Sequence, residues 1–134
     1  MPKTQVVFFQ EDDGKVPILN WLNTVRKQDK KGYANCIAKI QQLGEFGYDL
    51  RRPSADFLRN GIYELRAKHI RVQYRILYFF HGQNVVVLSH GIVKEKDRVP
   101  NIDIDRAIEN QELFRNNPEI YTYLEPEDFE YEEN

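Results

Sequence analysis

Blocks of apolar periodicity separated by polar breaks run along the chain, and each block predicts one element. Residues 4–9 are β-branched and aromatic and lead into an acidic turn with glycine, which predicts a strand. Pro17 suits the first turn of a helix, and two sets of apolar residues then recur at helical spacing. These sets are Ile18, Trp21, Leu22 and Val25, then Tyr33, Cys36, Ile37, Ile40 and Leu43. They predict an antiparallel pair of amphipathic helices with a polar link at 28–32 and a stop at Gly44 or Gly47.

The second half of the chain predicts a strand meander and a final helix. Three segments after a turn at Asn60-Gly61 are rich in strand-forming residues: 62–68, 71–80 and 85–90. Residues 81–84 carry hairpin chemistry, and Asn101 can cap a final amphipathic helix. The order β-α-α-β-β-β-α predicts an α+β fold, with the helical pair packed on a largely antiparallel four-stranded sheet and a C-terminal helix.

Length and composition indicate one packed domain. At 134 residues and 41% hydrophobic, the chain can bury a single core. Cys36 is the only cysteine, so neither a disulfide framework nor a zinc-ligand cluster is available, which fits a reducing compartment. The chain has no basic leader followed by a long apolar run and no stretch of about 18 apolar residues. We therefore expect a cytoplasmic protein without a membrane partner.

Charge is distributed unevenly. All 19 Lys and Arg lie in residues 1–116 with 14 of the 21 Asp and Glu, so this part carries +5, whereas residues 117–134 hold seven acids and no cation. We expect a basic domain at 1–116 and an acidic C-terminal tail at 117–134. A basic body is consistent with a polyanionic partner and also with an ordinary solvated surface.

The central strands carry a polar, mostly basic face. Side chains alternate across a strand, which places six of them in phase on two neighbouring strands. The six are Glu64, Arg66, Lys68, Arg71, Gln73 and Arg75. A tight turn at 69–70 would pair 68 with 71, 66 with 73 and 64 with 75, whereas a longer loop would shift this register.

Two interpretations of this face stay open. A guanidinium can donate two parallel hydrogen bonds to a phosphate and keeps its charge at any working pH, which suits Arg66 and Arg75 to holding RNA phosphates. Alternatively, Glu64 and Arg75 form an ordinary cross-strand ion pair worth roughly 0.2–1 kcal/mol. The second interpretation has weight because an antiparallel sheet commonly has one polar face.

Histidines and lysines near this face are candidates for proton transfer. Imidazole titrates near neutrality; His69 lies at the predicted turn and His90 ends the last strand, whereas His81 lies at the far end of the strands. Three cations follow the last strand: Lys94, Lys96 and Arg98. The alternative is structural, with hydrogen-bonded histidines and a solvated run of charges in a loop.

Motifs for cofactor chemistry are missing from the sequence. It contains no Gly-rich phosphate loop, no His-Glu-x-x-His helix and no Gly-x-Ser-x-Gly elbow. We therefore expect neither a metal nor a cofactor.

Three motifs on the predicted strands belong together. They are Asn-Gly-Ile-Tyr-Glu-Leu-Arg at 60–66, Tyr-Arg-Ile-Leu-Tyr-Phe-Phe at 74–80 and Leu-Ser-His-Gly-Ile-Val-Lys at 88–94, followed by Pro100 and Ala107. This pattern resembles the RelE/ParE toxin superfamily, specifically its HigB-like, phage-derived branch. The resemblance extends from about residue 4 to residue 115 and leaves out the acidic tail.

The resemblance implies a RelE-like fold and the toxin of a type II toxin–antitoxin pair. Such a toxin is a metal-independent endoribonuclease, an mRNA interferase that cuts messenger RNA on the ribosome and so inhibits translation. The ribose 2′-hydroxyl attacks the neighbouring phosphate while basic side chains neutralise charge and protonate the leaving oxygen. The implied partners are messenger RNA, the ribosome and a cognate antitoxin, which we expect to be a helix-turn-helix protein.

By position, the resemblance assigns Arg75 to the family's Tyr-Arg motif, Arg66 to its Glu-Leu-Arg motif and Lys94 to the first basic residue after the last strand. We predict catalytic residues among Arg66, Arg75, Lys94, His69 and His90. We predict RNA contacts from Lys68, Arg71, Gln73, Lys96 and Arg98.

The chain also departs from the family pattern. Ile62 and Glu64 replace the strand lysines of RelE, Glu95 separates Lys94 from Lys96, and the catalytic tyrosine has no counterpart. An alternative function therefore stays open, a degenerate toxin or a non-catalytic inhibitor that blocks a target such as gyrase. The tail from 119 to 134 has two interpretations, a segment that docks on the basic body in competition with RNA and a disordered acidic segment.

Overall fold

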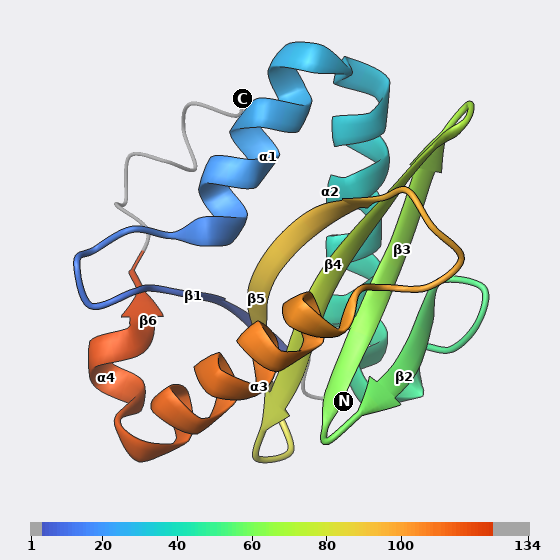
Figure 1. The fold of residues 1–134 in the computed structure, drawn as a ribbon. Helices are drawn as coiled ribbons and strands as arrows, with labels where there is room; N and C mark the ends of the chain where they lie inside the picture. Colours follow the sequence, from blue (N-terminus) through green and yellow to red (C-terminus); the bar gives the residue numbers. More distant parts are fainter. Residues whose placement is uncertain (1–3, 125–134) are drawn as a thin grey trace.

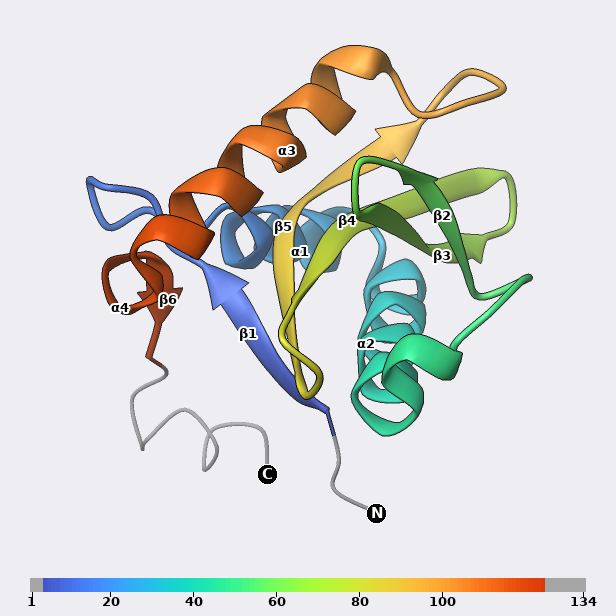
Figure 2. The same cartoon turned by 90° about the horizontal axis from the view of Figure 1, so that it is seen from below.

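The computed structural model describes residues 4–124, which form a six-stranded mixed sheet between two layers of helices (Figure 1). Helices α1 (Pro17–Gln28) and α2 (Lys30–Phe46) cover one face of the sheet, and α3 (Asn101–Asn116) crosses the other. Figure 2, turned by 90°, shows α3 and the helical pair on opposite sides of the strands. This confirms the predicted α+β class.

The helical pair forms where the sequence predicts it, with Asp29 alone between the two helices. The Asp29 side chain caps α2 by accepting a hydrogen bond from the Gly32 amide at 2.9 Å. Gly47 follows the last residue of α2 with φ +51°, a conformation that favours glycine. The link is shorter than predicted because the polar residues Lys30 and Lys31 already belong to α2.

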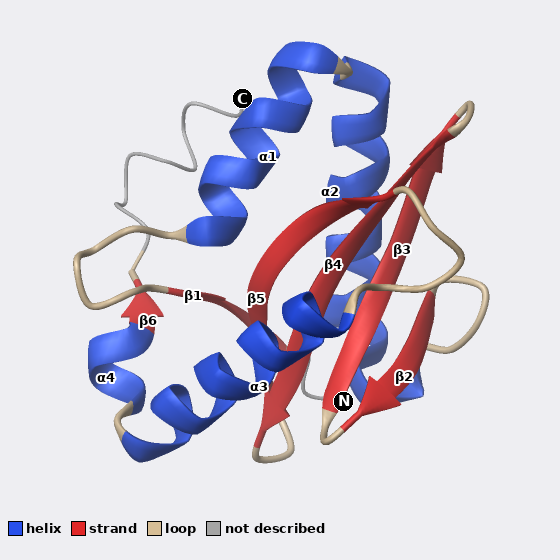
Figure 3. Ribbon diagram, viewed as in Figure 1, coloured by secondary structure: helices blue, strands red, loops and turns tan. Residues whose placement is uncertain are grey.

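The sheet contains more strands than predicted (Figure 3). The strands are β1 (Gln5–Phe9), β2 (Ala55–Arg59), β3 (Ile62–His69), β4 (Val72–His81), β5 (Val85–Lys94) and β6 (Thr122–Tyr123). They lie in the order β2-β3-β4-β5-β1-β6, with β1 parallel to β5 and the other neighbours antiparallel. The prediction of a four-stranded sheet is therefore wrong: β2 and β6 are short edge strands without a clear alternating pattern, and the contacts with β3 and β1 decide them.

The predicted turn at Asn60-Gly61 is confirmed and connects β2 to β3. Asn60 has φ +53° and Gly61 has φ +83°, so both central residues adopt the left-handed conformation of a type I′ hairpin turn. On the sheet face turned toward α1 and α2, the apolar residues of β3 and β4 pack against these two helices.

The predicted pairing of β3 with β4 is shifted by two residues. Lys68 pairs with Gln73 and Arg66 with Arg75, because the turn is formed by Ile70 and Arg71. A shift of two residues keeps each side chain on its face, so the predicted basic face survives with new neighbours. Arg71 leaves this face and lies in the turn.

Helix α3 covers only part of the second sheet face. Its buried residues Ile104, Ala107 and Phe114 pack on residues of β1, β4 and β5. The residue preceding the helix is Pro100, and Asn101 is already helical, so the predicted capping role of Asn101 is wrong. The residues of β3 and β4 toward their shared turn stay outside this apolar core, which positions the candidate site.

The predicted tail begins as part of the fold. Helix α4 (Pro118–Tyr121) leads into β6, which pairs with β1, and Tyr121 stacks on Phe9 with ring centroids 5.5 Å apart. β6 lies at the sheet edge opposite β2, away from the basic face. Residues 125–134, on which most of the proposed tail docking depends, lie outside the described residues.

Candidate functional site

The strand register arranges the polar face in rows across the sheet. One row contains Lys68, Gln73 and Lys94, and the next contains Arg66 and Arg75. Lys94 belongs to β5 rather than to the predicted loop after it, so a strand fixes its direction. The structure therefore brings together five of the predicted site residues.

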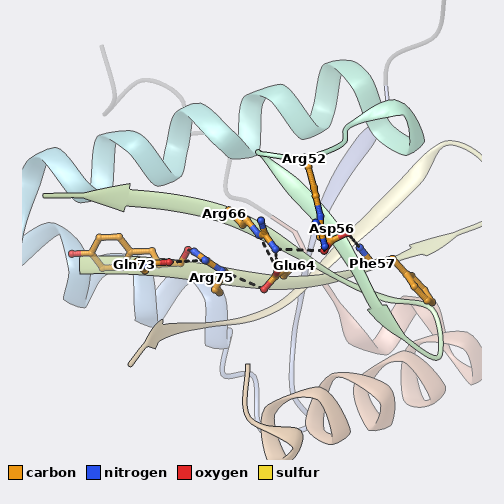
Figure 4. A network of polar contacts seen from close by, with 8 residues as sticks. Arg52, Asp56, Phe57, Glu64, Arg66, Gln73 and Arg75 are labelled. Atoms are coloured by element: carbon orange, nitrogen blue, oxygen red, sulfur yellow. Dashed lines mark hydrogen bonds and ion pairs between the residues drawn. The ribbon is translucent and has the colours of Figure 1, made fainter. Parts of the chain in front are cut away.

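An ion-pair network connects the arginines of this face (Figure 4). Glu64 lies between them: its Oε2 accepts a hydrogen bond from Arg66 Nε at 2.8 Å, and its Oε1 lies 3.3 Å from Arg75 Nε. Arg66 Nη2 also lies 3.4 Å from Asp56 Oδ2, and Arg52 Nη2 donates to the same oxygen at 2.6 Å. Each interpretation of the face has support in this network. The clustered arginines fit phosphate binding, whereas the two carboxylates that offset much of their charge fit a structural ion pair.

Arg75 is a buried anchor of this network. The residue is 5% exposed, and its Nη1 and Nη2 donate to Tyr74 O at 3.0 Å and Gln73 Oε1 at 2.7 Å. Its Nε is not aligned for a hydrogen bond and interacts with Glu64 by charge. Burial lowers the pKa of Arg75 and the Glu64 carboxylate opposes this shift. Since its Nη1 and Nη2 already donate within the protein and its Nε lies beside Glu64, Arg75 is placed to hold Glu64, and through it Arg66.

Arg66 presents the accessible guanidinium of the pair. Its side chain is 29% exposed, and within residues 4–124 no group hydrogen-bonds to its Nη1. The two carboxylates fix the Nε and Nη2 edge, which leaves Nη1 as a fixed donor for an anion. The pKa of Asp56 is lowered, mainly by its hydrogen bond from Arg52, so this carboxylate stays charged at neutral pH.

His69 lies apart from the two arginines. Along β3 the His69 side chain points to the opposite face from Arg66 and Lys68, which is the face covered by α1 and α2. There its Nδ1 lies 2.9 Å from Asp29 Oδ1, and Tyr74 Oη donates to Asp29 Oδ2 at 2.7 Å. The hydrogen bond from Tyr74, followed by that from the Gly32 amide, lowers the pKa of Asp29. The geometry favours the structural interpretation of His69.

His90 is buried between β5 and α3. It is 2% exposed, its Nδ1 lies 2.9 Å from Ser89 Oγ, and its Nε2 lies 3.3 Å from Asp103 Oδ1. Asn110 of α3 donates to Ser89 Oγ at 2.9 Å. Burial lowers the pKa of His90 to about 4, so its ring is neutral at pH 7 and joins the helix to the sheet.

The loop after β5 borders the polar face with further cations. A pocket of about 390 Å³ is lined by Val93, Glu95, Lys96, Arg98, Val99, Pro100 and Asn101. The Lys96 and Arg98 residues of this loop are exposed. Within residues 4–124, no three His, Cys, Asp or Glu side chains are grouped so that they could hold a metal ion.

Sequence reasoning missed Arg52 and Asp56 as members of the site. Asp56 enters through β2, where it pairs with Glu64, and β2 was not predicted. The available signal was the Asn60-Gly61 turn, because a hairpin turn requires a strand on each side.

The match to a protein family agrees with the strand motifs. Residues 23–112 match the family described as phage derived protein Gp49-like (DUF891), and the chain belongs to this family. It is a toxin-like family related to RelE and HigB. No curated protein matches the chain. Within residues 4–124, no helix has the length and apolar character needed to cross a bilayer.

Proposed function

We propose that this chain is the toxin of a type II toxin–antitoxin pair and cleaves messenger RNA at the face formed around Arg66. The observation that carries the proposal is the fixed guanidinium of Arg66, which two carboxylates hold while its Nη1 stays available. Membership of a toxin-like family supports the same function.

In the proposed reaction, the ribose 2′-hydroxyl attacks the adjacent phosphorus, forms a new P–O bond and expels the 5′ oxygen. Arg66 Nη1 binds a non-bridging oxygen and neutralises the charge that develops on it. Lys94 delivers a proton to the leaving oxygen, and the 2′-hydroxyl proton passes to solvent. Lys68 and Gln73, in the row beside the arginines, contact the neighbouring backbone, and no metal takes part.

The proposed partners follow from this role. The messenger RNA is presented by the ribosome, and a small helix-turn-helix antitoxin covers the Arg66 face. The exposed cations Lys96 and Arg98 lie beside this face. Their charge supports contact with RNA, and equally with an acidic segment of the antitoxin.

A second candidate is a non-catalytic toxin that blocks its target by binding. The observation that favours it is the position of the histidines: His69 pairs with Asp29 on the helix side, and His90 is buried and neutral. Neither is placed to exchange protons with an RNA bound at Arg66.

The test is to induce wild type, Arg66→Gln, Lys94→Gln and the control Arg115→Gln in a bacterium and map 5′ ends of messenger RNA. Arg115 is an exposed arginine in the last turn of α3, outside the polar face. We expect new ends within translated codons for wild type and Arg115→Gln, and at least about a hundredfold fewer for Arg66→Gln, as for loss of one oxyanion donor.

Arrested growth with intact RNA would replace cleavage by the binding mechanism. Cleavage that persists in both Arg66→Gln and Lys94→Gln would place the site elsewhere. Arg66 and Lys94 are partly exposed, so their replacement is expected to leave the core intact. Thermal denaturation of each variant checks that it folds.

A further inference from the structure

A second concentration of positive charge lies where the turn between α1 and α2 meets the turn between β3 and β4. We call it the basic corner, and its residues are Arg26, Lys27, Lys30, Lys31, Lys68 and Arg71. All six are exposed, and within the described chain none forms an ion pair. Asp29 is the only acid between residues 17 and 44, and its carboxylate is occupied by His69, Tyr74 and Gly32.

The contacts beneath the corner hold its two turns together. The β3–β4 turn is fixed to the helical pair by the contact between His69 and Asp29 at 2.9 Å. Asn35 of α2 donates to Lys68 O at 2.9 Å. Figure 1 shows the two turns at the same end of the molecule. The cations therefore form a preorganised surface rather than separate mobile charges.

Part of this charge opposes the stability of the fold. Arg26 and Lys27 lie in the last turn of α1, where cations interact favourably with the helix dipole. Lys30 and Lys31 instead occupy the first two positions of α2, where the dipole disfavours cations, and no acid lies in that turn. Residues that break a local stability rule are expected at functional surfaces, so helix stability does not account for these two lysines.

The basic corner differs from the Arg66 face in how its charge is balanced. At the Arg66 face, Asp56 and Glu64 contact the arginines, whereas the corner keeps its charge available to solvent. The exposed aromatic side chains of the described chain, Phe46, Tyr48 and Phe57, lie outside the corner, so it offers no platform on which a base could stack. Lysines and arginines without an exposed aromatic side chain beside them suit sequence-independent contact with phosphates.

We propose that the basic corner binds the phosphate backbone of a nucleic-acid duplex; the corner adjoins the Arg66 face at Lys68, and its other five cations lie outside that face. The proposal does not depend on RNA cleavage. The shared chemistry is a regular array of phosphates, which an RNA hairpin or a DNA duplex can supply.

The experiment measures binding of the full-length protein to an RNA hairpin and to a DNA duplex of the same sequence, across a series of salt concentrations. The test variant is Lys30→Gln/Lys31→Gln. The matched control is Arg106→Gln/Arg115→Gln, which removes the same charge from exposed positions of α3 on the other side of the sheet.

We expect the test variant to bind the preferred duplex at least about tenfold more weakly at low salt and to lower the salt-dependence slope by about 2, since about one counterion is released per phosphate contact. Its melting temperature should be unchanged or higher, because two unfavourable charges leave the start of α2. The control should bind like wild type. The preference between RNA and DNA identifies the source of the phosphates.

Equal weakening in test and control variants would overturn the proposal, because net charge alone would then explain binding. Wild-type affinity in the test variant would overturn it as well. So would binding to anionic lipid vesicles in the absence of duplex binding. Loss of duplex binding with cleavage retained would support the corner independently of the proposed ribonuclease.

Discussion

At the residue scale, Glu64 organises the candidate site. It is 5% exposed and contacts Arg66 and Arg75 from the two sides of one carboxylate. A buried ion pair adds little net stability, because desolvation offsets the attraction between the charges. Removing one partner alone is costly, since it leaves a buried charge without compensation. Glu64 is therefore required for the position of Arg66 and for tolerance of the buried Arg75.

We predict that Glu64→Gln lowers the free energy of unfolding by about 3 kcal/mol, because Arg75 then keeps its charge in the core without a carboxylate. The double replacement Glu64→Leu/Arg75→Met should lose less, since it removes both buried charges. Urea denaturation of the two variants and wild type measures the difference. A double variant less stable than Glu64→Gln would show that the pair itself stabilises the fold.

At the scale of elements, a buried network of hydrogen-bonded side chains joins β5 to α3. Ser89 and His90 of β5 contact Asn110 and Asp103 of α3. The contact with Asp103 fixes the first turn of α3 and the loop before it. This matters for the site because α3 borders the polar face. Burial lowers the pKa of His90 to about 4, so the ring is neutral in these contacts at pH 7.

We predict that stability falls as the pH is lowered from about 6.5 toward 4. In this range the unfolded chain binds a proton at His90, with its ordinary pKa of 6.5, while the folded chain does not. The slope from this one proton is at most about 1.4 kcal/mol per pH unit. Asp29 and Asp56 have lowered pKa values and act at more acidic pH, below their ordinary 3.8.

The measurement is urea denaturation at several pH values between 4.5 and 8 for wild type and His90→Gln. The variant cannot gain this proton, so its stability should change less over the same range. A pH dependence equal to that of wild type would assign the effect to other groups.

At the scale of the whole molecule, the two sheet edges have different roles. The β2 edge supplies Asp56 to the candidate site. Asp56 contacts Arg66 and accepts a hydrogen bond from Arg52. The opposite edge is covered by β6, where Gln10 N donates to Tyr121 O at 2.8 Å and Tyr123 pairs with Phe8. Residues 118–123 thus complete the fold at the edge distant from the basic corner and the Arg66 face.

We predict that a chain ending at Asn117 is less stable than a chain ending at Leu124 by roughly 2 kcal/mol, because Phe9 loses the Tyr121 ring and β1 becomes an open edge. Thermal and urea denaturation of the two truncated chains test this. Equal stability would mean that α4 and β6 contribute little to the folded body.

The sequence by itself determined the elements whose signal is local. Helical spacing predicted α1 and α2, alternation predicted β3 and β4, and the shared face of Arg66 and Arg75 survived a register shift because side chains repeat every two residues. The strand motifs, which are also local in sequence, indicated a toxin-like family, and the chain matches such a family.

Only the tertiary structure decided the features that depend on residues distant in sequence. The short strands β2 and β6 form because β3 and β1 supply their partners. The pairing of His69 with Asp29, the burial of His90 under α3 and the pairing of Arg66 with Asp56 follow from how the layers and strands pack. A sequence pattern gives the face of a side chain, whereas burial and ion pairing are set by the element that packs against that face.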